Sequence, residues 1–137
     1  MEYPSVFPGR TYDDAHAAIE FLVDAFGAER HAVHPGDNGT IDHAELRFGN
    51  GIVMLGSSKP DWPATRGAGG SIYLVVDDPD AHYRRARARG AEIIRELQDT
   101  DYGSREYGAR DPEGNAWYFG TYQPFAVEHP IEQEAGV

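Results

Sequence analysis

Hydrophobic and polar positions follow two different periods along this chain, and each period predicts its own elements. Apolar residues at helical spacing predict a helix over residues 15–26, and a capping Asp, Pro79 in the first turn and Gly90 after the last predict a second helix over about 79–89. Runs rich in β-branched and aromatic residues predict strands, after an extended segment over residues 3–12 that Pro4 and Pro8 interrupt. These strands are expected at residues 29–34, 41–48, 52–55, 71–76, 92–95, 106–109 and 116–122. The order is a strand, a helix and three strands, and then the same again.

The two halves share sequence anchors at a separation of 63 residues. The anchors are a helix-capping Asp, a glycine that ends the helix, and a turn glycine: Asp14 with Asp77, Gly27-Ala28-Glu29 with Gly90-Ala91-Glu92, and Gly51 with Gly114. The cap itself is Asp13 or Asp14 in the first half and Asp77 or Asp78 in the second. We therefore predict an α+β fold of two tandem βαβββ modules, which form a curved mixed sheet with a central cleft and carry their helices outside.

The pattern also predicts where the domain begins and ends. A single domain is expected over residues 1–123, with module one at about 3–57 and module two at about 71–122. A linker over residues 58–70, rich in Gly, Pro, Ser and Ala, joins the modules, and a polar C-terminal tail covers residues 124–137.

The composition excludes several classes of function. No cysteine is present, which removes disulfides, thiolate metal sites and cysteine nucleophiles. The formal net charge of −11 argues against a nucleic-acid partner, because phosphates attract basic surfaces, and it suits a cationic ligand. No apolar run approaches the length that crosses a bilayer, and no basic-then-apolar leader opens the sequence. We therefore expect a cytoplasmic protein with no membrane or nucleic-acid partner.

A resemblance to a known family rests on three features of the sequence. They are the helix from Asp14 to Gly27, the segment Asp78-Pro79-Asp80-Ala81 at the second helix, and the turn Asp111-Pro112-Glu113-Gly114. Together with the two modules, these features resemble the vicinal oxygen chelate superfamily over about residues 3–122. That superfamily holds glyoxalases, extradiol dioxygenases, fosfomycin-resistance enzymes and bleomycin-resistance proteins. The resemblance implies the fold and leaves the activity open.

Metal-using members of that superfamily take one His or Gln from the first strand of each module and one Glu from the last. Carried onto this chain, the first-strand positions fall at Phe7 and Ser71, and the last-strand positions fall at Tyr118 and, by analogy, Met54. Carboxylate oxygen or imidazole nitrogen binds a hard divalent metal, and none of these four side chains offers either. The resemblance thus implies a chain without the usual metal site, without a cofactor and without an assigned catalytic residue.

A non-standard metal site is one alternative. His43 and Glu45 alternate along one predicted strand and share a face, and His31 or His34 on the neighbouring strand offers a third ligand. A polar strand face that lines a wet cleft explains the same pattern. The histidines near the two helix starts are expected at the surface: His16 and His82.

Aromatic side chains in the second module and the linker suit a flat ligand. Tyr118 is expected to face the cleft, and Trp117, which alternates with it, to pack under a helix. Arg105 is expected either to bind a ligand carboxylate or to form an internal ion pair with Glu106. The expected ligand-binding residues are Phe7, His43, Glu45, Met54, Trp62, Tyr102, Arg105, Tyr107 and Tyr118.

The chain is most similar to the metal-free bleomycin-resistance branch, which implies binding without catalysis. The expected function is sequestration of a partly aromatic compound such as an antibiotic, with a cationic group favoured by the acidic chain. Proteins of that branch are homodimers that exchange an N-terminal strand, and the stiff arm containing Pro4 and Pro8 suits such an exchange.

Two other functions stay open at this point. One is a glyoxalase- or dioxygenase-like lyase or isomerase, which needs a site on His43 and Glu45 or metal-free acid–base chemistry of Tyr118 and Glu106. The other is a binding domain for an intracellular metabolite.

Overall fold

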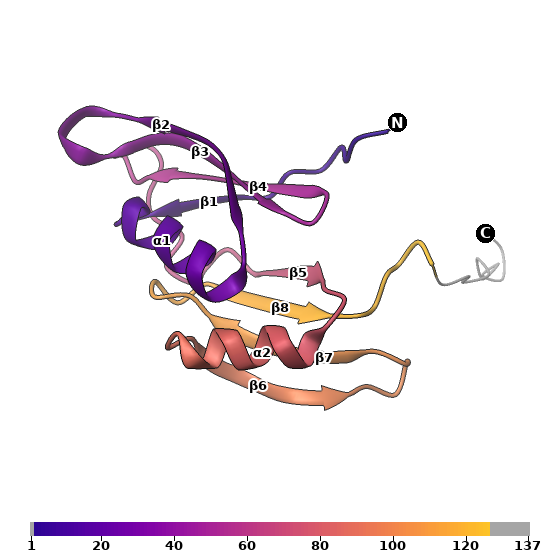
Figure 1. Ribbon diagram of the computed structural model, residues 1–137. Helices are drawn as coiled ribbons and strands as arrows, with labels where there is room; N and C mark the ends of the chain where they lie inside the picture. The colour runs from indigo at the N-terminus through magenta and orange to yellow at the C-terminus, as the bar shows by residue number, and fades with distance from the viewer. Residues whose placement is uncertain (1, 127–137) are drawn as a thin grey trace, which may run out of the picture.

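The computed structural model describes residues 2–126, and each predicted module forms a four-stranded sheet with one long helix (Figure 1). Module one contains β1 (Gly9–Tyr12), α1 (Ala15–Phe26), β2 (Glu29–Pro35), the short 3₁₀ helix η1 (Asp37–Gly39), β3 (Ile41–Phe48) and β4 (Gly51–Ser57). Module two contains β5 (Ser71–Val75), α2 (Pro79–Ala88), β6 (Glu92–Asp99), β7 (Arg105–Arg110) and β8 (Ala116–Gly120). The predicted α+β fold of two tandem βαβββ modules is confirmed. Most of the predicted C-terminal tail lies outside the described residues.

The two sheets have the same topology. Their strand orders are β1-β4-β3-β2 and β5-β8-β7-β6, so the first strand of each module lies beside its last. The first and last strands pair in parallel, and the remaining neighbours pair antiparallel. Each sheet is therefore mixed, and β1 and β5 are edge strands.

The helices begin and end where the sequence predicts. Asp14 and Asp78 are the N-caps, with nearly identical backbone angles, and the side chain of each accepts a hydrogen bond from the backbone N–H three residues later. These caps are 64 residues apart, so Asp78 and not Asp77 is the counterpart of Asp14. Gly27 ends α1 in the left-handed conformation, at φ 78°, which a residue without a Cβ adopts at little cost.

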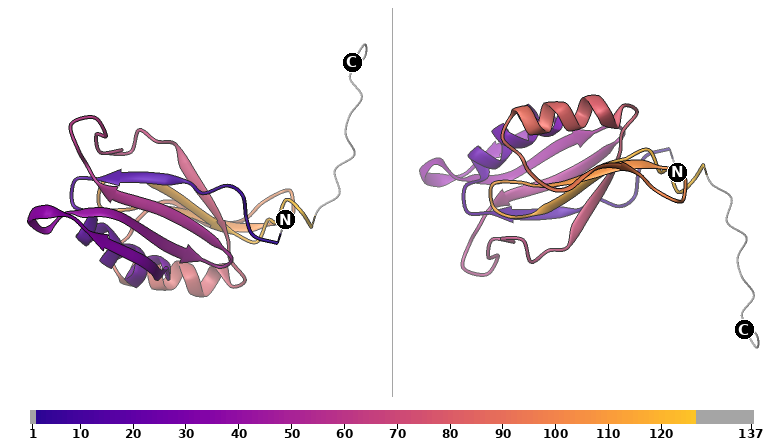
Figure 2. Two further views of the ribbon diagram at one scale, coloured as in Figure 1. Left: turned by 90° about the horizontal axis from the view of Figure 1, so that it is seen from above. Right: turned by 90° about the horizontal axis from the view of Figure 1, so that it is seen from below.

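Both helices cover the same side of the sheets, and the linker between the modules lies on the other side (Figure 2). The hydrophobic core therefore lies between the helices and the sheets, and it includes the fully buried Trp117, Phe119 and Leu22. Trp117 packs against Phe26 of α1 with ring centroids 5.8 Å apart, which confirms the prediction that it lies under a helix. We call the side of each sheet that carries no helix its open face.

Some element boundaries differ from those predicted. Only the last four residues of the extended segment form β1. The strand begins after Pro8, because proline has no N–H to donate to a sheet, and the Pro8 carbonyl accepts a hydrogen bond from the backbone N–H of Met54. Strand β6 continues to Asp99, which pairs with Arg105 on β7. Within the described residues, no helix is long and apolar enough to cross a membrane.

Candidate ligand-binding site

A pocket of about 430 Å³ lies on the open face of module one. Strand β1, strand β4 and the linker surround it, and its lining includes Gly9, Thr11, His43, Met54, Lys59 and Trp62. Glycine at position 9 keeps part of the β1 edge free of side chains. Trp62 is 67% exposed at the linker side, so its ring is available to a flat ligand. The pocket thus brings together three of the predicted ligand-binding residues from three separate segments.

The sheet registers place Met54 and Tyr118 at equivalent positions of the two modules. Met54 pairs with Gly9 on the first strand of module one, and Tyr118 pairs with Tyr73 on the first strand of module two. Both side chains lie on the open face, because their neighbours along the strand are buried in the core. The proposed analogy between these two positions therefore agrees with the fold.

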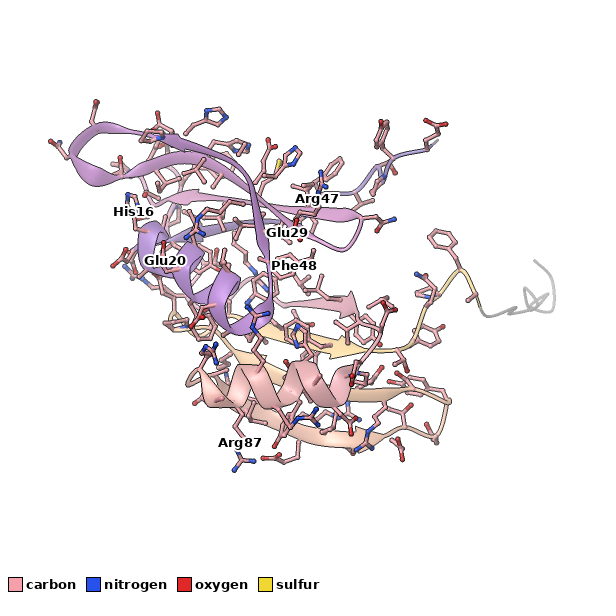
Figure 3. The ribbon with its side chains drawn as sticks, in the orientation of Figure 1. His16, Glu20, Glu29, Arg47, Phe48 and Arg87 are labelled. Carbon is pink, nitrogen blue, oxygen red and sulfur yellow. The ribbon has the colours of Figure 1, made fainter. Side chains whose placement is uncertain are left out.

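A polar group lies beside the pocket on β2 and β3. His43 Nε2 lies 2.8 Å from Glu45 Oε2, and this hydrogen bond lowers the pKa of the Glu45 carboxyl. His31 Nε2 lies 3.9 Å from the other carboxylate oxygen, and Arg47 donates to His31 Nδ1 over 3.2 Å (Figure 3). The His34 and His43 rings stack with centroids 6.0 Å apart. Glu45 thus already accepts from a histidine, and its neighbourhood is wet and half-exposed.

The residues present do not fit the metal that the superfamily commonly uses. The four equivalent positions carry phenylalanine, serine, methionine and tyrosine, whose side chains are poor ligands for a hard divalent cation. Within residues 2–126, no group of three or more His, Asp or Glu side chains is arranged to hold a metal ion. His31 and His43 form a hydrogen-bonded and electrostatically coupled polar surface with the Glu45 carboxylate.

The open face of module two carries a carboxylate enclosed by tyrosines. Glu106 on β7 is only 4% exposed, and it accepts hydrogen bonds from Tyr73 Oη over 2.8 Å and from Tyr102 Oη over 2.5 Å. Desolvation by burial raises the pKa of Glu106, but the hydrogen bonds from Tyr102, Tyr73 and Ser104, together with the charge of Arg95, lower it by more, so the pKa is lowered overall. The Glu106 side chain is therefore ionised near neutral pH. Its cover comes from the two tyrosines and not from the core.

Two glycines make room for these side chains on the sheet. A Cβ built at Gly120 would lie 2.5 Å from both Glu106 Cγ and Tyr73 Oη. A Cβ at Gly108 would lie 2.5 Å from Tyr118 Cε1. The Tyr118 ring therefore lies along the sheet above Gly108, as an aromatic floor on the open face. Tyr118, which the sequence predicts to face the cleft, lies on the open face of module two and is not part of the pocket lining on module one.

Two predicted positions need correction. Tyr107 is fully buried, because it lies on the core side of β7, opposite in direction to Glu106, and its ring stacks on Phe119 at 5.1 Å. His82, expected at the surface, lies between the helices and bonds to Tyr107 Oη and to the Phe26 carbonyl. Burial lowers the pKa of His82, so this histidine is a neutral packing residue. Tyr107 and His82 thus belong to the core and not to the open face.

Of the two alternatives for Arg105, the ion pair with Glu106 is wrong. Arg105 Nε donates to Asp80 over 2.7 Å, and its Nη1 donates to Asp99 over 3.1 Å. Its side chain therefore points toward α2 and the end of β6, so it forms an internal pair with different partners. Phe7 lies just before β1 and is 42% exposed, at the N-terminal side of module one.

A buried arginine that sequence reasoning missed lies at the joint between the modules. Arg10 is 4% exposed, its Nη2 donates to the carbonyls of Gly70 and Ala116, and its guanidinium lies 5.6 Å from the Trp117 ring centroid. Among the described residues, its Nε has no hydrogen-bond partner. The clue in the sequence is its alternation with Tyr12, because residues two apart on a strand share a face. Arg10 also contributes to the pocket wall.

Comparison with known proteins agrees with this architecture. A model of the glyoxalase/bleomycin resistance protein/dioxygenase superfamily matches residues 8–119. The chain belongs to this superfamily. The match spans both βαβββ modules and ends at the last core residue of β8, so it covers the pocket and the tyrosine-lined face alike.

Relatives within the superfamily cover most of the chain. The Mycobacterium bovis protein Mb0911c is 34% identical over 125 residues, which span 85% of this chain and 82% of that protein. The crystal structure of TioX from Micromonospora sp. ML1 is 34% identical, with a TM-score of 0.72, and the match covers 85% of this chain and 94% of TioX. TnmS3, an antibiotic binding protein from Streptomyces sp. CB03234, shares the fold at 24% identity and a TM-score of 0.68, over 87% of this chain and 96% of TnmS3.

Proposed function

We propose that this chain is a metal-free small-molecule-binding protein that sequesters a partly aromatic compound, such as an antibiotic. The observation that carries the proposal is the pocket on module one, where Trp62 and Met54 offer apolar contact beside the polar edge of His43. Ligand sites commonly combine apolar walls with a few polar groups that fix orientation. Donor chemistry at the four metal positions supports binding over metal catalysis. The described antibiotic-binding activity of TnmS3 is consistent with such a role.

We further propose that the protein acts as a homodimer, with an exchanged N-terminal segment. Two apolar side chains of this segment are left uncovered in a single chain, since Tyr3 is 77% and Val6 is 79% exposed. Strands β1 and β5 each lie at an edge of their sheet, and a sheet edge favours pairing with a second copy. An interface over the open faces would also enclose the pocket and remove water from a bound ligand.

Isothermal titration calorimetry with bleomycin and an anthracycline tests the binding proposal. Binding of either compound should weaken about tenfold in Trp62→Ala, because a lost aromatic contact at the centre of a site commonly exceeds 1 kcal/mol. Phe125→Ala is the matched control, since Phe125 is 99% exposed and lies outside the pocket. Unchanged affinity in Trp62→Ala would remove the pocket from the proposal, and absence of binding by both compounds would contradict sequestration of this ligand class.

Size-exclusion chromatography with light scattering tests the dimer. The expected particle has about twice the chain mass of 15.1 kDa. Removal of residues 2–7 should shift the population toward monomer if the N-terminal segment is exchanged. A monomer at all micromolar concentrations would refute the dimer, and a dimer unaffected by the truncation would refute the exchange alone.

A further inference from the structure

We propose that the open face of module two binds a cationic alkylammonium group, with Glu106 as its counter-ion and Tyr73 and Tyr102 as its aromatic walls. The inference deepens the proposed function, because it names the chemical group that a bound compound would place on this face. It rests on the geometry around one carboxylate, and this geometry lies on the other module from the pocket.

Glu106 has no direct ion-pair partner among the residues that the structure describes. Its neighbour Arg105 pairs with Asp80 and Asp99, and no basic side chain of residues 2–126 forms an ion pair with Glu106. Arg95 on β6 pairs with Gly108, two residues from Glu106, and its charge lowers the pKa of the Glu106 carboxyl without a direct ion pair. A covered carboxylate that has no direct ion-pair partner creates a negative potential that water screens poorly. The unfilled position beside the carboxylate is the feature that points to a cationic ligand.

The tyrosines around Glu106 offer the surface that such a cation prefers. Tyr102 is 55% exposed and Tyr73 is 37% exposed, so their rings remain available although their hydroxyls bind the carboxylate. The Tyr122 ring meets Tyr102 edge-on, with centroids 5.6 Å apart, and extends the aromatic surface. Electron-rich ring faces attract cations, and an alkylated ammonium loses little hydration when it contacts them. The rings and the carboxylate thus attract the same kind of group.

The backbone is shaped to hold this arrangement. Glycine at position 120 gives Glu106 and Tyr73 the space that a Cβ would occupy, and the Tyr73 hydroxyl also accepts the backbone N–H of Tyr122 over 3.0 Å. Tyr102 lies in the loop before β7, where Gly103 adopts φ 85° and the chain reverses its direction. The carboxylate and its tyrosines are therefore held by three strands and one loop, as a built site and not as a chance surface cluster.

The same group is poorly suited to acid–base catalysis. Burial raises the pKa of Tyr73, and the hydrogen bond to Glu106 raises that of Tyr102, so both hydroxyls remain protonated donors. Their hydrogen bonds lower the pKa of Glu106 and make it a weaker base. A stable, ionised carboxylate that is held by two donors acts as a fixed negative charge. Such a charge supports recognition of a cation without a chemical step.

A pair of isosteric probes tests the proposal on the full-length protein. Choline carries a trimethylammonium group, and 3,3-dimethylbutan-1-ol has the same shape without the charge. In an NMR titration, choline should shift the amide and ring signals of Tyr73, Tyr102 and Glu106 at about tenfold lower concentration than the neutral alcohol. Binding of choline should weaken as salt increases, because part of the attraction is electrostatic. Equal affinity for the two probes, or no binding of choline, would overturn the proposal.

Glu106→Gln removes the charge and keeps the side-chain shape, and it should reduce choline affinity about tenfold with no change for the alcohol. Glu96→Gln is the matched control, because Glu96 also accepts a hydroxyl hydrogen bond, from Tyr83, on the α2 side of the sheet where Arg87 lies (Figure 3). Choline binding unchanged by Glu106→Gln would overturn the proposal. If Glu106→Gln fails to fold, Tyr102→Ala provides the second test, because Tyr102 is exposed and lies outside the core. Unchanged choline binding by Tyr102→Ala would also overturn the proposal.

This test separates the cation site from the proposed sequestration function. A Glu106-dependent preference for choline, together with no binding of bleomycin or the anthracycline, would leave the cation site standing and refute sequestration of those compounds. Binding of an aromatic antibiotic through Trp62, together with equal binding of choline and its neutral isostere, would do the reverse.

Discussion

Two regions of the molecule use the same kinds of side chain for different purposes: the joint that connects the two modules, and the open face of module two. At the joint, Asp111 Oδ2 accepts from Tyr12 Oη over 2.6 Å and from Trp117 Nε1 over 3.1 Å, and all three residues are buried. On the open face, Glu106 accepts from two tyrosines that are themselves exposed. An acidic side chain that accepts hydrogen bonds from aromatic residues therefore stabilises the fold where those residues are buried, as at Asp111. Where those residues are exposed, as at Glu106, the same arrangement is available to bind a ligand.

The joint also explains the turn that carries the family resemblance. The Glu113 carboxylate accepts the backbone N–H groups of Asp13 and Asp14, over 2.7 and 2.8 Å, at the start of α1. The Asn115 side chain accepts the backbone N–H of Gly67 in the linker over 2.9 Å. The turn of module two thus holds both the first helix of module one and the linker. Its residues connect modules, whereas the open-face residues leave groups free for a partner.

Asp111→Asn should have the largest effect, because it breaks this joint. The amide would turn a donor toward Tyr12 Oη or Trp117 Nε1, and each buried donor left without an acceptor costs about 1–3 kcal/mol. We expect the free energy of unfolding in urea to fall by about 3 kcal/mol or more. Asp101→Asn, at an exposed turn, is the control and should change stability by less than about 0.5 kcal/mol. Equal effects of the two substitutions would show that the joint is not a stabilising network.

Gly108→Ala should have the next largest effect and acts on the open face. The new Cβ would meet the Tyr118 ring at 2.5 Å, so the ring must leave its position along the sheet. Overpacking of this kind costs about 1–3 kcal/mol, although the half-buried Tyr118 ring can swing toward solvent and reduce the cost. We expect weaker binding of any ligand that contacts Tyr118, with a smaller loss of stability than in Asp111→Asn. Tyr118→Ala together with Gly108→Ala should recover the stability, as a double-mutant cycle would measure.

The elements of this fold could be predicted because their signals are local. The caps Asp14 and Asp78 and the glycine at position 27 mark the helix ends within a few residues of sequence. Alternation along β8 correctly separated Trp117 from Tyr118, because a strand sends successive side chains to opposite faces. The analogy between Met54 and Tyr118 agrees with the strand registers, where these residues are 64 apart like the caps Asp14 and Asp78, whereas the sequence anchors indicated a separation of 63.

The candidate site was less predictable, because it depends on contacts between distant segments. Tyr107 was assigned by its closeness to Tyr102 in sequence, although its alternation with Glu106 puts the two on opposite faces. His82 was taken as a surface residue because it is near a helix start, yet it is three residues after Pro79 and four before Ala86, which are both buried. The partners of Glu106 could not be predicted locally. Tyr73 reaches Glu106 only through the pairing of β5 with β8 and of β8 with β7.

Substitution of His82 should have a moderate effect on stability that depends on pH. His82, like the residues of the joint, is a buried structural residue. Burial lowers its pKa in the folded protein below the ordinary histidine value of about 6.5, so the unfolded chain binds more protons under mildly acidic conditions. The stabilisation is fully present above about pH 6.5 and is lost as the pH falls through the folded pKa. Chemical denaturation between pH 7.5 and 5 should show this decline, and His82→Gln should remove part of it. His16→Gln, on the exposed side of α1 (Figure 3), should retain the full decline; the same slope in both variants would assign the decline to other groups.

Of these substitutions, Glu45→Gln should have the smallest effect on stability. Its partner His43 is half-exposed, and an exposed charged pair contributes about 0–1 kcal/mol, because water competes for both groups. We therefore expect the thermal midpoint to change by less than about 2 °C, which corresponds to a few tenths of a kcal/mol for a domain of this size. A ligand that reaches the β2–β3 side of the pocket should still bind more weakly to the variant, since His43 lines that pocket and loses its negatively charged acceptor for a neutral amide oxygen. A stability loss as large as that of Asp111→Asn would place the His43–Glu45 pair among the structural contacts, and the open face would then be held together by the same means as the joint.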